Sequence, residues 1–143
     1  MESQAPYTFG VEAEAAPEDV KAVWDGLADY NRAIMGRGQY EELRIFLRDA
    51  DGRVAGGLLG ETYWGWLHIN IFWLEDAARR QGLGTQLLAM AEDEGRRRNC
   101  KYAFLDTLSF QARPFYEKNG YELFATQEDY PLGHTRYFLK KTL

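Results

Sequence analysis

The sequence predicts an α/β (α+β) fold in which helices flank one mixed central sheet of six to seven strands. Three observations predict it: short apolar segments typical of strands are numerous, two longer segments repeat apolar residues at helical spacing, and turn residues separate them. The 143 residues are 45% apolar, enough to bury one core. Without an internal repeat or a linker, residues 1–143 are predicted to form a single domain.

The first half of the chain is predicted to contain one helix and several strands. Weak alternation over residues 7–14 indicates a first strand. Pro17, with acidic neighbours and apolar residues at helical spacing after it, predicts a helix over about 18–30. Residues 43–48 and 54–63 read as two strands joined by an Asp-Ala-Asp-Gly turn, so we expect a hairpin there.

The second half alternates strands and helices. A long apolar strand is predicted over 66–74, followed by an amphipathic helix over 82–98 and a strand over 101–107. A short helix over 112–119, which ends at Gly120, comes next, and two final strands are predicted over 121–125 and 135–139.

Composition excludes several classes of protein. Seventeen Lys and Arg against 22 Asp and Glu give a net charge of −5, which disfavours general nucleic-acid binding. Cys100 is the single cysteine, so no intramolecular disulfide or cysteine-based zinc site is expected, and no convincing metal cluster is visible. No apolar run approaches the roughly 20 residues that span a bilayer, and no signal segment is recognisable. We therefore expect a cytoplasmic protein.

The segment Arg79-Arg80-Gln81-Gly82-Leu83-Gly84-Thr85 lies between the long strand and the amphipathic helix. Such a junction leaves unpaired backbone N–H groups at the helix start, where the helix dipole favours an anion. Glycines allow a pyrophosphate to approach, and the arginines add positive charge. The segment lacks the Lys-Ser/Thr pair of a P-loop and the third glycine of a dinucleotide fingerprint, whose place is taken by Leu87. It therefore predicts an anion site of another kind.

Two segments carry a family resemblance. Residues 74–84, Leu-Glu-Asp-Ala-Ala-Arg-Arg-Gln-Gly-Leu-Gly, resemble the acetyl-CoA signature of the GNAT superfamily of N-acetyltransferases, with its Arg/Gln-x-x-Gly-x-Gly/Ala core. Residues 112–121, Ala-Arg-Pro-Phe-Tyr-Glu-Lys-Asn-Gly-Tyr, resemble the family's second signature. Both occur in the family's order with one strand between them. The chain is therefore identified as a small, single-domain member of bacterial type with a GNAT-like sheet.

The resemblance implies roles for particular residues. The end of the long strand, at Trp73 and Leu74, would pair with the pantetheine amides. The hydroxyl of Ser109 would replace an asparagine that often contacts the pantetheine arm. The CoA pyrophosphate would be bound by the backbone amides of Arg79, Arg80, Gln81, Gly82, Leu83, Gly84 and Thr85. Tyr116 stands where many members keep a tyrosine near the CoA sulfur; the alternative is a packed core aromatic.

The catalytic base is predicted on the long strand. Regular alternation places His68 and Asn70 on one face, with Leu67, Ile69, Ile71 and Trp73 on the other. His68 also aligns with a position at which some family members carry a glutamate base, and an imidazole can take a proton from an ammonium. The alternatives are Glu61, then His134, or no side-chain base if the amine arrives neutral. A backbone N–H near Leu74 is the expected oxyanion donor.

These residues predict an acetyl-CoA-dependent N-acetyltransferase that acts by direct attack in a ternary complex. Aromatic and acidic side chains favour a small cationic amine as acceptor, and the candidate contacts are Glu61, Trp64, Trp66 and Asn70. The alternatives are acetylation of a protein amine, a non-catalytic CoA-binding or interaction module of the same fold, and a nucleotide-binding regulator. A homodimer fits the family, and no nucleic acid, membrane or metal partner is expected.

Overall fold

The computed structural model describes residues 6–143, which form two units, residues 6–38 and 39–143. The first unit contains α1 (Pro17–Met35), in which Pro17 occupies the first turn with Glu18 and Asp19. This helix starts as predicted but runs five residues beyond Tyr30, and it ends at Gly36, whose φ of 74° suits a glycine. The expectation of a single domain stays a prediction.

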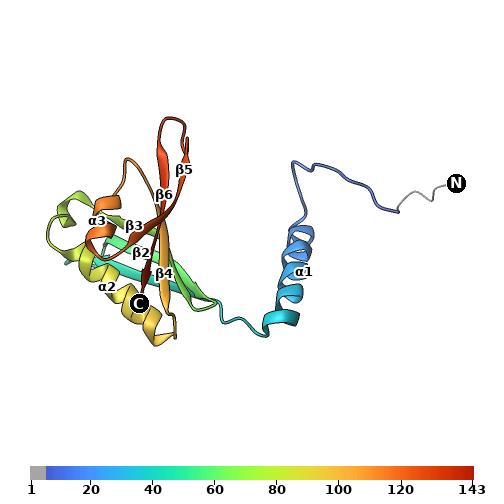
Figure 1. Cartoon of the computed structure of the whole chain (residues 1–143), viewed down its shortest axis with the longest axis horizontal. Helices are drawn as coiled ribbons and strands as arrows, with labels where there is room; N and C mark the ends of the chain where they lie inside the picture. Colours follow the sequence, from blue (N-terminus) through green and yellow to red (C-terminus); the bar gives the residue numbers. More distant parts are fainter. Residues whose placement is uncertain (1–5) are drawn as a thin grey trace. The chain divides into compact units, whose positions relative to one another are not determined.

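The second unit is a six-stranded sheet in the order β1-β2-β3-β4-β6-β5 (Figure 1). β3 and β4 run parallel, and every other neighbouring pair is antiparallel. The predicted mixed sheet is therefore confirmed. The strands are β1 (Glu41–Arg48), β2 (Val54–Tyr63), β3 (Trp66–Leu74), β4 (Tyr102–Leu108), β5 (Glu122–Glu128) and β6 (Thr135–Thr142).

One expected strand is wrong. Residues 7–14 form neither helix nor strand and are exposed. Their alternation is weak, and an isolated extended segment has no ladder partner to satisfy its backbone groups. The seventh strand is thus absent from the part of the chain that the structure describes. The hairpin between β1 and β2 forms as expected, with Asp49 Oδ1 accepting hydrogen bonds from the amides of Asp51 and Arg53, both at 2.9 Å.

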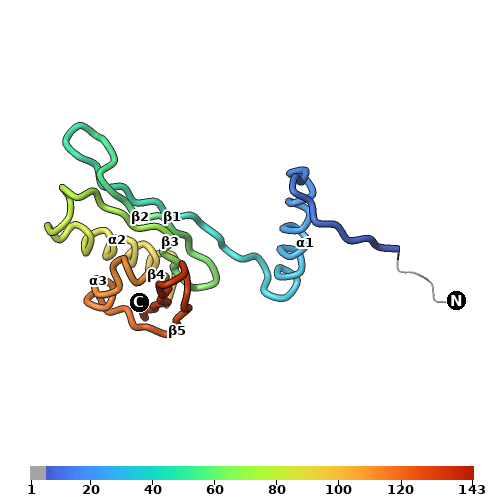
Figure 2. The backbone as a smooth tube through the Cα atoms, turned by 90° about the horizontal axis from the view of Figure 1, so that it is seen from above, coloured from blue at the N-terminus to red at the C-terminus, as the bar shows by residue number. Residues whose placement is uncertain are grey.

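Two helices of the second unit cover one face of this sheet (Figure 2). They are α2 (Leu83–Arg97) and the short α3 (Arg113–Lys118), while a 3-10 turn, η1 (Asp76–Ala78), precedes α2. The core lies between the helices and the sheet. Its members are mostly aliphatic side chains that are almost fully buried, including Leu58, Leu67, Leu88, Leu105 and Leu139.

A bulge in β3 changes which side chains face the helices. Leu59 of β2 pairs with Ile71, but the next residue, Gly60, pairs with Ile69, so Asn70 is left without a partner. Alternation is therefore reversed beyond Ile69. Phe72 packs against the core, while Ile71 is 53% exposed. The predicted faces hold from Trp66 to Ile69, but those of the residues after the bulge are wrong.

β3 and β4 diverge immediately after the bulge. Their parallel pairing covers only Trp66–Ile69 against Tyr102–Leu105. The backbone groups of Trp73 and Glu75 face β2: Trp73 O lies toward that strand, and the Glu75 amide donates to Ala55 O at 2.9 Å. By strand alternation the backbone groups of Leu74 face the opposite side, toward the opening between β3 and β4. The fold thus provides an open slot between two otherwise adjacent strands.

Among residues 6–143, no helix is both long and apolar enough to cross a membrane.

Candidate active site

The loop that enters α2 has a geometry suited to an anion. Gly82 is the N-cap of α2 with φ 76°, and Arg80 also has a positive φ of 64°. No side chain caps the start of the helix. The first amides of α2 therefore keep their hydrogen-bonding capacity for an external acceptor, and the helix dipole favours a negative one.

Side chains of the loop hold it in place. Arg79 Nε donates to Leu74 O at 3.0 Å, and the same guanidinium pairs with Asp76 at 3.1 Å. Gln81 Nε2 donates to Ala77 O at 2.7 Å. Both side chains are therefore engaged within the loop. The Arg79 amide also donates to Asp76 O at 3.2 Å, so the amides that follow it are the groups left for a ligand.

Gly84 brings the two signature segments together. A Cβ at this position would lie 3.3 Å from Phe115 Cζ and 3.5 Å from Leu74 Cδ1. A side chain here would require the Phe115 ring to shift by a few tenths of an ångström. The second glycine of the first signature thus allows close packing of the loop against the second signature, which is a structural reason for their joint occurrence.

Tyr116 lies on the helix face of the sheet and is only 7% exposed. Its ring makes edge-to-face contacts with Phe72, Phe115 and Tyr121. Burial, together with the charge of Asp106, raises the pKa of the Tyr116 phenol to about 12. Phe72 and Asp106 follow the point where β3 and β4 diverge. Tyr116 therefore lies at the slot, with its proton retained at neutral pH.

Ser109 follows β4, and its hydroxyl is already engaged. Ser109 Oγ accepts a hydrogen bond from the Thr135 amide at 3.1 Å and lies 3.3 Å from His134 Nδ1. These contacts tie the end of β4 to the start of β6. His134, the third candidate for the base, is therefore held beside Ser109 at this end of β4.

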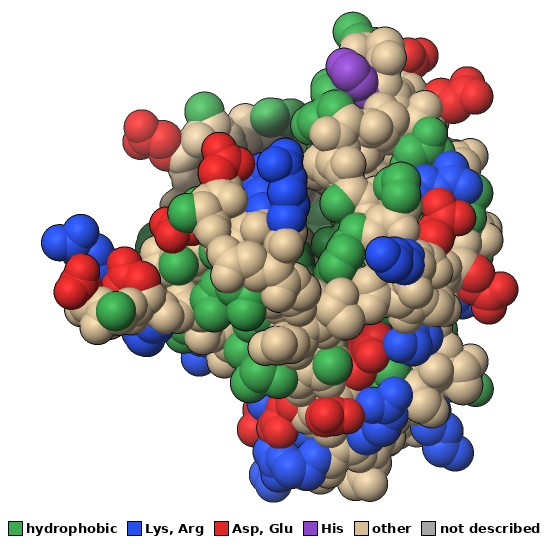
Figure 3. Space-filling model, turned by 90° about the vertical axis from the view of Figure 1, so that its left-hand side faces the viewer, with side chains coloured by type: hydrophobic (Ala, Val, Ile, Leu, Met, Phe, Trp, Pro, Cys, Tyr) green, Lys and Arg blue, Asp and Glu red, His purple; other side chains and the backbone are tan. Residues whose placement is uncertain are grey.

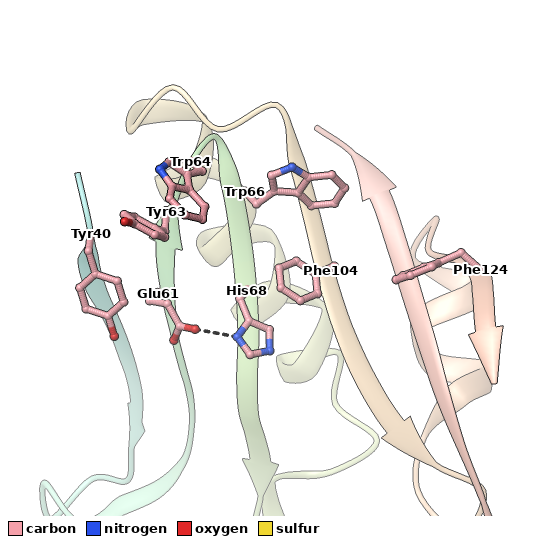
Figure 4. A pocket seen from close by; sticks show the side chains of 8 residues that line it. All are labelled: Tyr40, Glu61, Tyr63, Trp64, Trp66, His68, Phe104 and Phe124. Atoms are coloured by element: carbon pink, nitrogen blue, oxygen red, sulfur yellow. Dashed lines mark hydrogen bonds and ion pairs between the residues drawn. The ribbon is translucent and has the colours of Figure 1, made fainter. Parts of the chain in front are cut away.

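The aromatic pocket occupies the opposite face of the sheet, with a volume of about 440 Å³ (Figure 4). Six aromatic side chains, from four strands, from the β2–β3 turn and from the segment before β1, enclose one carboxylate and one imidazole. The lining residues are Tyr40, Glu61, Tyr63, Trp64, Trp66, His68, Phe104 and Phe124. A site of this composition can hold a cationic or aromatic molecule beside groups that exchange protons.

Glu61 and His68 are directly opposite each other on β2 and β3. Glu61 Oε1 lies 2.6 Å from His68 Nδ1, and both side chains are 25% exposed. The imidazole also stacks on Phe104, with ring centroids 4.5 Å apart and planes inclined by 11°. The histidine is therefore held from two sides. It is one residue from the end of the β3–β4 pairing, so the pocket adjoins the slot.

The structure brings most of the predicted acceptor residues together. Glu61, Trp64, Trp66 and His68 all line the pocket, but Asn70 does not, because the bulge removes it from the expected alternation. The sequence reasoning missed three aromatics: Tyr40, Phe104 and Phe124. Alternation within β4 was the available signal for Phe104, since its neighbours Ala103 and Leu105 are core residues. Tyr40 and Phe124 gave no comparable signal.

Cys100 is 6% exposed at the junction of α2 and β4. Burial raises the pKa of its thiol, although Arg98 acts in the opposite direction. The nucleophilic thiolate is thus disfavoured at neutral pH, which argues against a covalent acyl-cysteine intermediate.

Figure 3 shows the face toward which α3 and the start of α2 lie. This face is hollowed between two lobes, with hydrophobic side chains in the hollow and Lys or Arg side chains at its rim (Figure 3). An apolar trough with a basic rim suits a ligand that has an elongated uncharged part and phosphate groups.

The model of the Acetyltransferase (GNAT) family matches residues 7–121. The chain belongs to the GNAT family of acetyltransferases. Acetyltransferase Atu2258 of Agrobacterium fabrum is 37% identical over 127 residues, which are 89% of this chain and 93% of that protein. Blasticidin-S acetyltransferase of Streptomyces morookaense is 43% identical over 93 residues, or 64% of this chain and 68% of that protein.

The fold gives the same assignment. A crystal structure of a putative acetyltransferase from Agrobacterium tumefaciens superposes with a TM-score of 0.88 and 35% identity, over 96% of this chain and all of that one. GNAT acetyltransferases use acetyl-CoA, and the uncapped start of α2, the close approach at Gly84 and the β3–β4 slot fit such a ligand. Among residues 6–143, no three His, Cys, Asp or Glu side chains are grouped to hold a metal ion.

Proposed function

We propose that this GNAT enzyme acetylates the primary amine of a small cationic molecule by direct attack in a ternary complex. The observation that carries the proposal is the aromatic pocket, which contains the Glu61–His68 pair and adjoins the β3–β4 slot. Aromatic faces and a carboxylate favour a cation over an anion. A volume of about 440 Å³ suits a small molecule or one end of it.

A relative supports a small-molecule acceptor. The Streptomyces protein is named for the acetylation of blasticidin S, and it matches this chain over 68% of its own length. The shared region makes an amine-bearing small molecule a better first candidate than a protein amine. Blasticidin S itself is a reasonable first test compound.

The same proposal assigns the cofactor contacts. Backbone amides from Arg80 to Thr85 bind the pyrophosphate, while Leu74 O on the β3 edge accepts a pantetheine amide. Arg79 and Trp73, expected for the same contacts, contribute less, because the Arg79 amide already donates to Asp76 O at 3.2 Å and Trp73 O is turned toward β2. Ser109 Oγ already accepts the Thr135 amide and lies 3.3 Å from His134 Nδ1, so its hydroxyl can donate to the pantetheine arm when it does not donate to that nitrogen. Bound acetyl-CoA supplies an activated thioester, so the residues need only orient the amine, accept a proton and donate one.

Three groups then share the chemistry. His68 accepts a proton from the ammonium, and the freed nitrogen attacks the carbonyl carbon, so that a C–N bond forms and the C–S bond breaks. The Leu74 amide, which faces the slot, stabilises the developing oxyanion. Tyr116 donates its proton to the departing sulfur, and its high pKa ensures that the phenol is protonated beforehand.

A panel of amines with acetyl-CoA tests the proposal, with CoA release followed by a thiol-reactive dye and the product identified by mass spectrometry. We expect turnover with cationic primary amines, including polyamines, aminoglycosides and blasticidin S, in preference to neutral or acidic acceptors. Turnover confined to acidic or neutral acceptors, or to protein amines, would contradict the cationic pocket. A cytoplasmic location and a homodimer remain predictions, for which fractionation and light scattering are the direct measurements.

A further inference from the structure

The arrangement of Glu61 and His68 restricts the protonation of the imidazole. A carboxylate can only accept hydrogen bonds, so the 2.6 Å contact requires that His68 Nδ1 carries a hydrogen and donates it. The other ring nitrogen, Nε2, points away from Glu61 (Figure 4). In the neutral ring, Nε2 therefore has the free lone pair, which is the group that a base needs.

Phe104 fixes the remaining freedom of the ring. The two rings are almost parallel, with an interplanar angle of 11° and centroids 4.5 Å apart. Rotation of the imidazole about its bond to Cβ would break both the stacking and the hydrogen bond. Stacking and hydrogen bonding together thus hold one ring orientation, in which Nε2 points away from Glu61.

We infer that Glu61 is a positioning residue for His68, rather than an alternative base or a direct contact of the amine. It holds His68 in the tautomer with Nδ1 protonated and stabilises the imidazolium that forms when Nε2 takes the substrate proton. The inference rests on the proposed function, because it assigns the base of that reaction. It also explains why a carboxylate and a histidine occur at one cross-strand position in a pocket that is otherwise aromatic.

Other charged groups on this face have partners of their own. Glu42 of β1, which lies opposite Glu61, is paired with Arg44. On the far side, the Lys140 ammonium lies 5.4 Å from the Phe124 ring centroid, and Asp106 pairs with Arg136 at 2.9 Å. Tyr40 and Tyr63 also line the pocket. Glu61 is therefore the carboxylate in contact with His68, and Glu42→Gln is a matched control that removes a nearby negative charge without touching the imidazole.

The first test needs no substrate. The chain has two histidines, His68 and His134, so the imidazole nitrogens of the ¹⁵N-labelled protein give an assignable NMR spectrum, with His134→Gln identifying the second set. We expect wild type and Glu42→Gln to show His68 protonated at Nδ1 with Nε2 unprotonated near pH 8. Glu61→Ala should show a mixture of tautomers. Glu61→Gln can keep the tautomer, because its amide oxygen still accepts the Nδ1 hydrogen. An unchanged tautomer in Glu61→Ala would overturn the inference.

The second test is kinetic. We expect Glu61→Ala to lower kcat at least about tenfold with little change in KM for the amine. Loss of the carboxylate that orients a catalytic histidine lowers kcat in the same way in Ser-His-Asp enzymes. Glu61→Gln should lie between, because its amide oxygen still accepts the Nδ1 hydrogen but carries no charge. In a double-mutant cycle, Glu61→Ala should add little in a His68→Gln background. Additive effects, or a rise in KM alone, would overturn the inference.

The two failures are distinguishable. If the wild-type enzyme acetylates none of the amines, the proposed function is wrong, while the NMR result still decides whether Glu61 sets the tautomer. If it acetylates amines and Glu61→Ala keeps the wild-type kcat, only the positioning role fails.

Discussion

Replacing Tyr116 with phenylalanine removes one hydroxyl from a ring whose packing the substitution retains. The edge-to-face contacts with Phe72, Phe115 and Tyr121 do not involve the oxygen. The unfolding free energy at pH 7 should therefore change by no more than about 1 kcal/mol. If the phenol protonates the departing sulfur, kcat should fall by about 10²- to 10⁴-fold, while the Kd for acetyl-CoA changes less than about twofold. Steady-state CoA release and calorimetric titration give the two quantities.

Tyr121→Phe is the matched control. This neighbouring tyrosine is also buried, but its hydroxyl donates to Glu92 at 2.8 Å and Lys141 binds the same carboxylate at 3.0 Å. We expect Tyr121→Phe to lower stability by about 1–3 kcal/mol, because Glu92 loses a partner, with kcat close to that of wild type. Equal losses of kcat in the two variants, or a parallel loss of acetyl-CoA affinity in Tyr116→Phe, would refute the reasoning and leave Tyr116 as a packing residue.

Three further predictions follow from the same geometry. Burial raises the pKa of Tyr116 from about 10 to about 12, so this phenol should contribute a loss of about 2–3 kcal/mol of stability between those pH values. Urea titrations should show an alkaline loss that is smaller by this amount for Tyr116→Phe. Gly60→Ala would place a Cβ 2.1 Å from the His68 carbonyl oxygen, so it should cost about 3 kcal/mol by urea denaturation, whereas a cost below about 1 kcal/mol would show that the bulge is adaptable. Trp64→Ala should raise KM for a cationic amine about tenfold without changing acetyl-CoA affinity; an unchanged KM would place the acceptor elsewhere.

Local patterns in the sequence predicted the elements that carry strong signals. The two-glycine loop before α2, the Asp-Ala-Asp-Gly hairpin and the helix ended by Gly120 each depend on backbone chemistry that a few adjacent residues specify. The strand at 7–14 could not be judged in this way, because a strand forms only where another strand pairs with it.

The candidate site was predicted only where regular alternation holds. Glu61, Trp64, Trp66 and His68 lie before the bulge and are found in the pocket, whereas Asn70 stands in the bulge and is not. Gly60 permits this bulge through its lack of a side chain, but a lone glycine does not reveal which strand residue loses its partner. Phe124 reaches the pocket through the sheet order, which no local pattern encodes.

The central claim is that the loop before α2 binds the pyrophosphate of acetyl-CoA. The stabilisation of Gly82→Ala by acetyl-CoA tests this claim most directly. An added Cβ at Gly82 meets nothing within 4 Å, so the variant should fold with only the cost of a φ near 76°. Gly52→Ala in the β1–β2 turn, with φ 81° and equally open space, is the control. At a concentration of 100 times its Kd, acetyl-CoA should stabilise wild type and Gly52→Ala by about 2.7 kcal/mol, but Gly82→Ala far less, and NAD should stabilise none of them. Equal stabilisation of Gly82→Ala by acetyl-CoA, or stabilisation of wild type by NAD, would contradict the account.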